Sequence, residues 1–159
     1  MIRNAAAYED DFYAWTQEQA RLMRAGLHGE LDLENLAEEI EIMGRKQRNE
    51  LHNRLAQLAL HLLKWLHQPG YRGASWRQSI RKQRKQVAQL LSESPSLKPV
   101  LAEIFAEAYA EARLDAADET GLPLKTFPTV PPFTYVQASD PQYPPDLGGP
   151  EQEPALPHN

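Results

Sequence analysis

Five cations fall within nine consecutive positions of the stretch SWRQSIRKQRKQ, which covers residues 75–86. They are Arg77, Arg81, Lys82, Arg84 and Lys85. Arg77, Arg81 and Arg84 are spaced by four and three residues, so they share one face if this stretch is a helix. Such a row can bind phosphates or another anionic partner, or it can pair with acidic side chains inside the protein.

An acidic row follows in the next predicted helix and offers an internal partner for these cations. Glu103, Glu107, Glu111 and Asp115 are spaced by four residues and therefore lie along one helical face. A basic helix joined to an acidic helix by a short loop can pack antiparallel to it. We favour this internal match, and we keep a solvent-exposed basic face and an anion or nucleic-acid site as alternatives.

Carboxylates and histidines on an earlier helix are weak candidates for a metal site. Glu34, Glu38 and Glu41 share one helical face. A metal site in a helical bundle is expected to use Glu-x-x-His pairs on facing helices, and the sequence contains no such pair. His52 and His61 are nine residues apart, which puts them on opposite sides of a helix. We therefore predict no metal site and no bound cofactor.

The composition and the motifs argue against several classes of enzyme. The chain of 159 residues has no cysteine, which excludes disulfides, thiolate metal sites and cysteine nucleophiles. It has no Gly-x-Ser-x-Gly elbow, no phosphate loop and no dinucleotide fingerprint. We assign no catalytic residue and favour a protein that is not an enzyme.

The distribution of apolar residues predicts a cytoplasmic protein without a membrane segment. The first residues lack an apolar core of signal-peptide length. The most apolar run, residues 55–66, is interrupted by polar residues and is too short to span a bilayer.

The net charge of −5 conceals three blocks of opposite sign. Residues 1–43 carry ten acids and three bases, and residues 99–159 carry ten acids and two bases. Residues 44–98, between them, carry two acids and twelve bases. Such blocks can attract each other within the fold or attract an outside partner.

Helical periodicity predicts four main helices, one of them long. The apolar spacing indicates helices over about residues 10–25, 33–67, 76–92 and 99–120. Asp32 and Ser75 are predicted to cap the second and third helices. The predicted fold is therefore an all-α bundle.

The C-terminal part has a different chemistry, because ten of the 13 prolines follow residue 122. Proline excludes long helices, yet this part also carries Phe127, Phe133, Tyr135 and Tyr143, which are unusual in a free linker. We predict three regions: a helical bundle over 1–121, an ordered irregular arm packed on it over 122–145, and a disordered tail over 146–159.

Several long strings resemble a known bacterial family. They are YEDDFYAWTQEQARLMRAG, LDLENLAEEIEIMGR, HLLKW, SWRQSIRKQR and ETGLPLKTFP. The chain resembles, from about residue 8 to residue 145, the family catalogued as domain of unknown function twenty-nine. The resemblance implies an all-α fold and a prokaryotic source, and it implies no activity, cofactor or catalytic residue.

Three functional hypotheses remain open. The first is a non-enzymatic interaction module that binds another protein or a second copy of itself. The second is a nucleic-acid-binding protein that uses the basic row at residues 77–85. The third is a metal-dependent or hydrolytic enzyme centred on Glu34, Glu38 and Glu41 together with a histidine.

Overall fold

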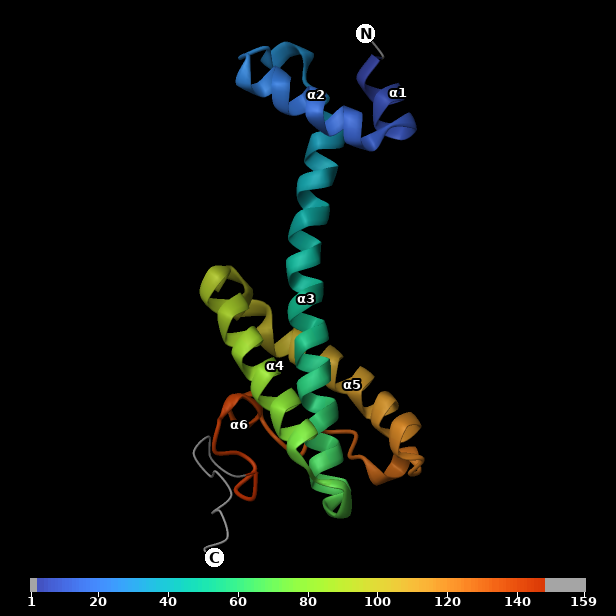
Figure 1. Cartoon of the computed structure of the whole chain (residues 1–159), viewed down its shortest axis with the longest axis vertical. Coiled ribbons are helices and arrows are strands. Elements are labelled where there is room, and N and C mark those ends of the chain that lie inside the picture. Colours follow the sequence, from blue (N-terminus) through green and yellow to red (C-terminus); the bar gives the residue numbers. More distant parts are fainter. Residues whose placement is uncertain (1–2, 148–159) are drawn as a thin grey trace, which may run out of the picture. The chain divides into compact units, whose positions relative to one another are not determined.

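A computed structural model describes residues 3–147, and residues 1–2 and 148–159 lie outside the described part. Six α-helices occur within the described residues (Figure 1). They are α1 (Arg3–Asp10), α2 (Phe12–Arg24), α3 (Leu33–His67), α4 (Ala74–Glu93), α5 (Leu101–Thr120) and α6 (Tyr135–Ser139). Residues 3–147 contain no strand. The prediction of an all-α fold with four main helices is confirmed, since these correspond to α2, α3, α4 and α5.

The chain divides into two compact units, Met1–Lys46 and Gln47–Asn159. Helix α3 contributes residues to both units. This division differs from the single bundle that we predict over residues 1–121. The apolar periodicity of α3 continues through the boundary, but the buried side chains of α3 begin only at Leu51.

The first unit is organised around Trp15, which is 2% exposed. The indole Nε1 of Trp15 donates a hydrogen bond to Oδ2 of Asp32 at 3.0 Å. The backbone N of Asp32 donates to Oε1 of Gln19 at 2.8 Å, which links α2 to the start of α3. Tyr8 of α1 packs edge-on against Trp15 and donates its hydroxyl to Glu39 at 2.5 Å.

Two helix starts differ from the sequence prediction. The first predicted helix is interrupted, because Asp11 leaves the helical conformation and its side chain caps α2 by accepting from the backbone N of Ala14. Helix α4 begins at Ala74, after an extended Gly73, and has no side-chain cap. Ser75 therefore lies in the first turn of α4 and is not its cap.

The core of the second unit joins α3, α4, α5 and the C-terminal arm. Apolar side chains from each helix point into one cluster and are excluded from water, which is the main source of stability. The fully buried members include Leu55, Leu62 and Leu63 of α3, Ile80 of α4, and Ile104, Ala108, Ala112 and Ala116 of α5.

The arm begins after Gly121, whose positive φ of 71° ends α5 in the left-handed conformation that glycine adopts easily. It continues to residue 147 and contributes Phe127, Phe133 and Leu147 to the core at no more than 2% exposure. Leu147 and its neighbour Asp146 fall in the tail that we predict to be disordered, whereas the structure places both in the arm. The rest of the predicted tail lies outside the described residues.

Candidate functional site

The irregular arm leaves backbone carbonyl groups without helical partners, and side chains of α5 supply donors for several of them. Arg113 donates from Nε to the carbonyl of Phe127 at 2.8 Å and from Nη2 to that of Leu124 at 3.3 Å. The hydroxyl of Tyr109 donates to the carbonyl of Pro128. The first half of the arm is thereby fixed on α5.

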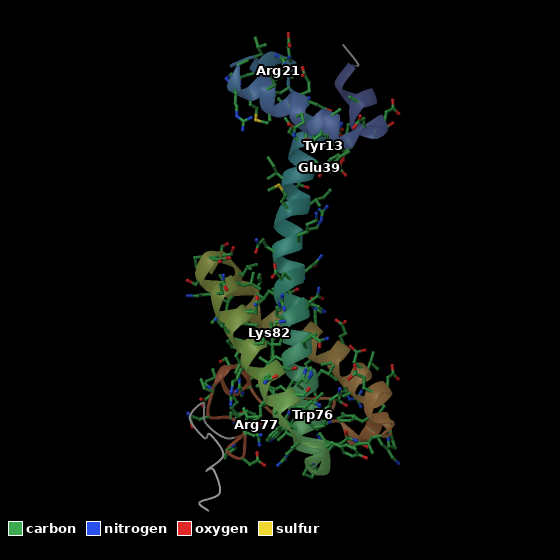
Figure 2. All side chains as sticks on the ribbon, viewed as in Figure 1. Tyr13, Arg21, Glu39, Trp76, Arg77 and Lys82 are labelled. Atoms are coloured by element: carbon green, nitrogen blue, oxygen red, sulfur yellow. The ribbon has the colours of Figure 1, made fainter. Side chains whose placement is uncertain are left out.

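Two of the five cations singled out in the sequence bind the second half of the arm in the same way. Arg84 donates from Nε to the carbonyl of Ala138 at 2.7 Å and from Nη2 to the carbonyl of Tyr143. Arg77, on the same helix (Figure 2), donates from Nε to the carbonyl of Leu147 at 2.9 Å. Guanidinium groups suit this role because they donate in several directions at once.

The end of the arm also packs against Trp65 of α3. The guanidinium carbons of Arg72 and Arg77 lie 5.0 and 5.3 Å from the centre of the indole ring, within cation–π range. The Trp65 Nε1 donates to Asp146 at 3.0 Å, and Arg72 forms an ion pair with the same carboxylate. The hydrogen bond from Trp65 and the positive charge of Arg72 lower the pKa of Asp146 below its ordinary value.

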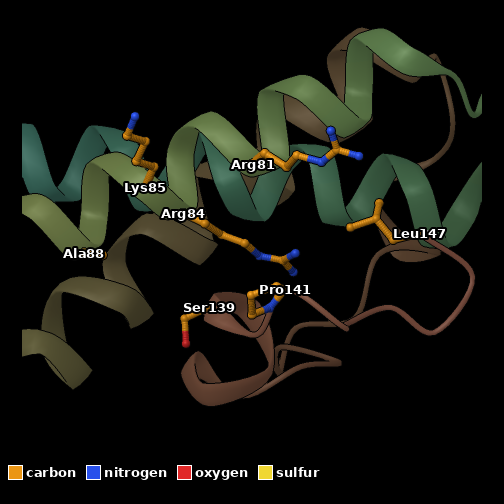
Figure 3. Close-up of a pocket in the computed structure, with 7 residues that line it drawn as sticks. All are labelled: Arg81, Arg84, Lys85, Ala88, Ser139, Pro141 and Leu147. Atoms are coloured by element: carbon orange, nitrogen blue, oxygen red, sulfur yellow. The ribbon is translucent and has the colours of Figure 1, made fainter. Parts of the chain in front are cut away.

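A pocket opens between α4 and the second half of the arm (Figure 3). Its volume is about 320 Å³. Seven residues line it: Arg81, Arg84, Lys85, Ala88, Ser139, Pro141 and Leu147. In Figure 3, Arg84 extends from α4 toward Pro141, and Arg81 extends toward the Leu147 end. The pocket thus combines three cations with an apolar lining.

The cations that do not bind the arm have no acidic partner among residues 3–147. Arg81, Lys82 and Lys85 are exposed, and none of them forms a hydrogen bond or an ion pair with another described residue. Arg81 and Lys85 line the pocket, whereas Lys82 does not. Asp140 is the acid whose charge acts on the pocket's third cation, Arg84. An anion that enters the pocket therefore meets an excess of positive charge.

The guanidinium of Arg84 is only partly satisfied by the arm. Its Nη1 atom is buried and has no hydrogen-bond partner. Burial lowers the pKa of Arg84 to about 10, and the charge of Asp140 partly opposes this shift. A buried donor without an acceptor costs free energy, so the site gains stability from any acceptor that can reach it.

The acidic row of α5 does not meet the basic row of α4, so the internal match predicted from the sequence is wrong. Two of its members instead pair with basic side chains of α3, in the pairs Arg48–Glu107 and His52–Glu111. Glu119, which follows the row on α5, pairs with Lys64 of α3. The row lies beside Ile104 and Ala108, whose fully buried side chains pack into the core where α3 runs. Two of the α4 cations, Arg77 and Arg84, bind the arm instead.

The weak metal candidates do not form a metal centre in the described part of the chain. Glu34, Glu38 and Glu41 are all exposed on α3. No group of three potential ligands comes together among residues 3–147. His52, which the sequence analysis also considered, lies against Glu111 of α5.

Several residues of the site were missed at the level of sequence. Arg113 and Arg72 carry isolated charges in the sequence and belong to no row, yet they bind the arm or its anchor Trp65. A usable signal was present, because a proline-rich segment that contributes aromatic side chains to a core needs donors for its carbonyls. The pocket itself depends on the path of Ser139 and Pro141, which no local pattern specifies.

These features define a class of protein: an all-α protein in which arginines of two helices bind an irregular arm. The chain belongs to the family described as domain of unknown function DUF29, whose model matches residues 7–144. The chain matches no curated protein and no solved structure. None of the helices within residues 3–147 combines the length and apolar character needed to cross a membrane.

Proposed function

We propose that this protein is a non-enzymatic interaction module that binds an acidic segment of another protein at the pocket between α4 and the arm. The observation that carries the proposal is the unpaired positive charge at this pocket. Arg81 and Lys85 are exposed beside it without acidic partners, and Arg84 contributes a buried donor without an acceptor.

The dimensions of the pocket favour a single anionic group. A volume of about 320 Å³ accommodates a carboxylate side chain and part of its backbone. The apolar residues Ala88, Pro141 and Leu147 can contact the methylene groups of such a side chain. Charge-assisted hydrogen bonds from guanidinium groups to a carboxylate are short and directional, so they would set its orientation.

The lining residues favour recognition over chemistry. The hydroxyl of Ser139 donates to the carbonyl of Val136 at 3.0 Å, and the seven lining residues include no histidine or carboxylate that could activate it. We place this binding activity in the cytoplasm, in keeping with a sequence that has no cysteine.

Nucleic-acid binding is the second candidate, because Lys82 extends the exposed positive surface beyond the pocket. Two observations weigh against it. Arg77 and Arg84 each donate to backbone carbonyls of the arm, and the chain as a whole carries a net charge of −5. A nucleic acid would therefore meet a short basic row on an otherwise acidic protein.

The experiment compares two charge-matched double variants in a binding titration. The probe is a short fluorescein-labelled glutamate peptide, and its anisotropy is measured at low salt. R81E/K85E reverses the two pocket cations, whereas K98E/K125E makes the same charge change at two exposed lysines that do not line the pocket. We expect R81E/K85E to weaken binding about tenfold or more, which corresponds to at least about 1.4 kcal/mol.

Two results would contradict the proposal. The first is equal weakening in both double variants, which would show a general charge effect. The second is tighter binding of a labelled single-stranded oligonucleotide of the same charge, with a steep dependence on salt. That second result would establish nucleic-acid binding in place of the proposed function.

A further inference from the structure

The first unit buries very few of its large apolar side chains. Trp15 and Leu22, at 2% exposure each, are the large apolar residues that the described part of this unit buries. Its exposed large apolar residues are Phe12, Tyr13, Met23, Leu27, Leu33, Ile40 and Met43. A unit of this size with so small a core gains little from its own packing, so its apolar surface is suited to a partner.

Four of the unit's small and apolar residues form a row on the exposed face of α3. Leu33, Ala37, Ile40 and Gly44 are spaced by four, three and four residues, which keeps them on one side of the helix. Leu33 and Ile40 are each 66% exposed. We call these four residues the α3 row. It differs from the side of α3 that receives Tyr8 at Glu39.

The α3 row alternates large and small side chains. Leu33 and Ile40 project, whereas Ala37 and Gly44 leave space between them. A Cβ atom built on Gly44 meets nothing within 4 Å, so no contact inside the described chain requires a glycine there. Glycine destabilises the interior of a helix, but it lets a second helix approach closely. The row therefore presents alternating projections and gaps into which the side chains of a second helix can pack.

Acidic side chains lie along one edge of the α3 row and indicate that its partner is positively charged. Glu34, Glu38 and Glu41 are exposed, and none of them forms an ion pair with another residue of the described chain. A partner with lysine or arginine beside its apolar residues would neutralise them. A partner with acidic residues at the same place would be repelled.

The same charges argue against a second copy of this chain as the occupant. In an antiparallel pair of α3 helices, Leu33 could pack over Gly44 of the other copy, but Glu34 and Glu41 would then face each other across the interface. In a parallel pair, the large residues would meet large ones and the small would meet small ones. Neither arrangement satisfies both the shape and the charge of the row.

We propose that the α3 row is the docking site for a basic amphipathic helix of another protein. The apolar residues of that helix pack between Leu33 and Ile40, and its lysine or arginine residues pair with Glu34, Glu38 and Glu41. This is packing of one helix against the exposed face of another, with apolar anchors at helical spacing. The proposal concerns a different surface from the α4–arm pocket and does not depend on the function proposed for it.

The test uses the full chain and two model peptides that share one apolar pattern. One peptide carries lysines beside its leucines, and the other carries glutamates at the same positions. Binding is followed by the change in fluorescence of a label on each peptide, and helix formation by circular dichroism. We expect the leucine–lysine peptide to bind and become helical, and the leucine–glutamate peptide not to bind.

Variants then locate the site. We expect I40S to weaken binding of the leucine–lysine peptide about tenfold, and E38K/E41K to weaken it by about the same factor. The matched controls are L114S, at a leucine that is 54% exposed on α5, and E103K/D118K, at two exposed acids of α5. The controls should bind like the wild type. R81E/K85E should also leave this binding unchanged, which separates the two proposals.

Three results would overturn the inference. They are equal binding of the two peptides, equal weakening in the controls, and a dimer in sedimentation analysis that I40S converts to a monomer. The last would assign the α3 row to a second copy. If I40S lost helix content by itself, E38K/E41K would still decide the question, because its exposed positions contribute no packing to the unit.

Discussion

The Nε atom of Arg84 lies 2.7 Å from the carbonyl oxygen of Ala138, so a cation of α4 is bound to the backbone of the arm and not to an acidic helix. This contact divides the basic row of α4 into two groups. Arg77 and Arg84 bind the arm, whereas Arg81, Lys82 and Lys85 remain without acidic partners among the described residues. The first group holds the arm, and we propose that Arg81 and Lys85 of the second group serve binding, together with the unpartnered Nη1 of Arg84.

Replacement of Arg84 by alanine is expected to destabilise the second unit. The change removes the donors to the carbonyls of Ala138 and Tyr143 and leaves those groups unpaired. Hydrogen bonds that involve a charged group contribute about 1.5–3 kcal/mol, so the free energy of unfolding should fall by about that amount. Urea denaturation measures the change. The control R81A should stay within about 0.5 kcal/mol of the wild type, and an equal effect of both would refute the division of the row.

Replacement of Phe127 by alanine tests whether the arm belongs to the core. Phe127 is fully buried and lies 5.0 Å, ring centre to ring centre, from His67 of α3. Truncation of a buried phenylalanine costs about 3–5 kcal/mol, and we expect a loss in that range by urea denaturation. V130A, at a residue of the arm that is 76% exposed, is the control and should change little. A small effect of F127A would show that the arm is dispensable.

Asp146 should make the stability of the second unit sensitive to acid. Its pKa is lowered from 3.8, so the folded state favours the carboxylate. The stabilisation is complete above the ordinary pKa and is lost as the pH falls through the lowered one. The difference in unfolding free energy between the wild type and D146N should therefore shrink as the pH falls below 3.8. A difference that does not change with pH would contradict this role.

The pairing of the acidic row with α3 predicts a measurable coupling between Arg48 and Glu107, which lie 3.4 Å apart. Both side chains are more than one-third exposed, so a double-mutant cycle to alanine should give a coupling of only about 0.2–1 kcal/mol. The parallel cycle between Arg81 and Glu107 should give none. A coupling in the second cycle and not in the first would contradict this pairing and would support ion pairs between α4 and α5.

The extent to which sequence determines this structure differs between its parts. The helices were predictable because the positions of Leu55, Leu62, Ile80 and Ile104 follow the helical period and those side chains fill one core. The arm was expected from its prolines and aromatic residues, and Phe127 and Phe133 are buried in the structure.

The partners of the charged rows were not predictable from spacing. Spacing along a helix shows that Glu107 and Glu111 share a face, but it does not show which neighbouring helix lies opposite. Arg77 and Arg84 donate to arm carbonyls that have no helical partner. Which carbonyls lack a partner is known only once the path of the backbone is known. For the same reason, the α4–arm pocket has no signature in the sequence.

The most direct test of the central claim is a nuclear magnetic resonance titration of the isotopically labelled chain with the glutamate peptide. The account predicts that the resonances that shift belong to residues 81–88 of α4 and 138–147 of the arm. The side-chain Nε–H signal of Arg84 should remain protected from exchange throughout, because that group donates to Ala138 in the free protein. Shifts confined to other surfaces, or no shifts at low salt, would contradict the account.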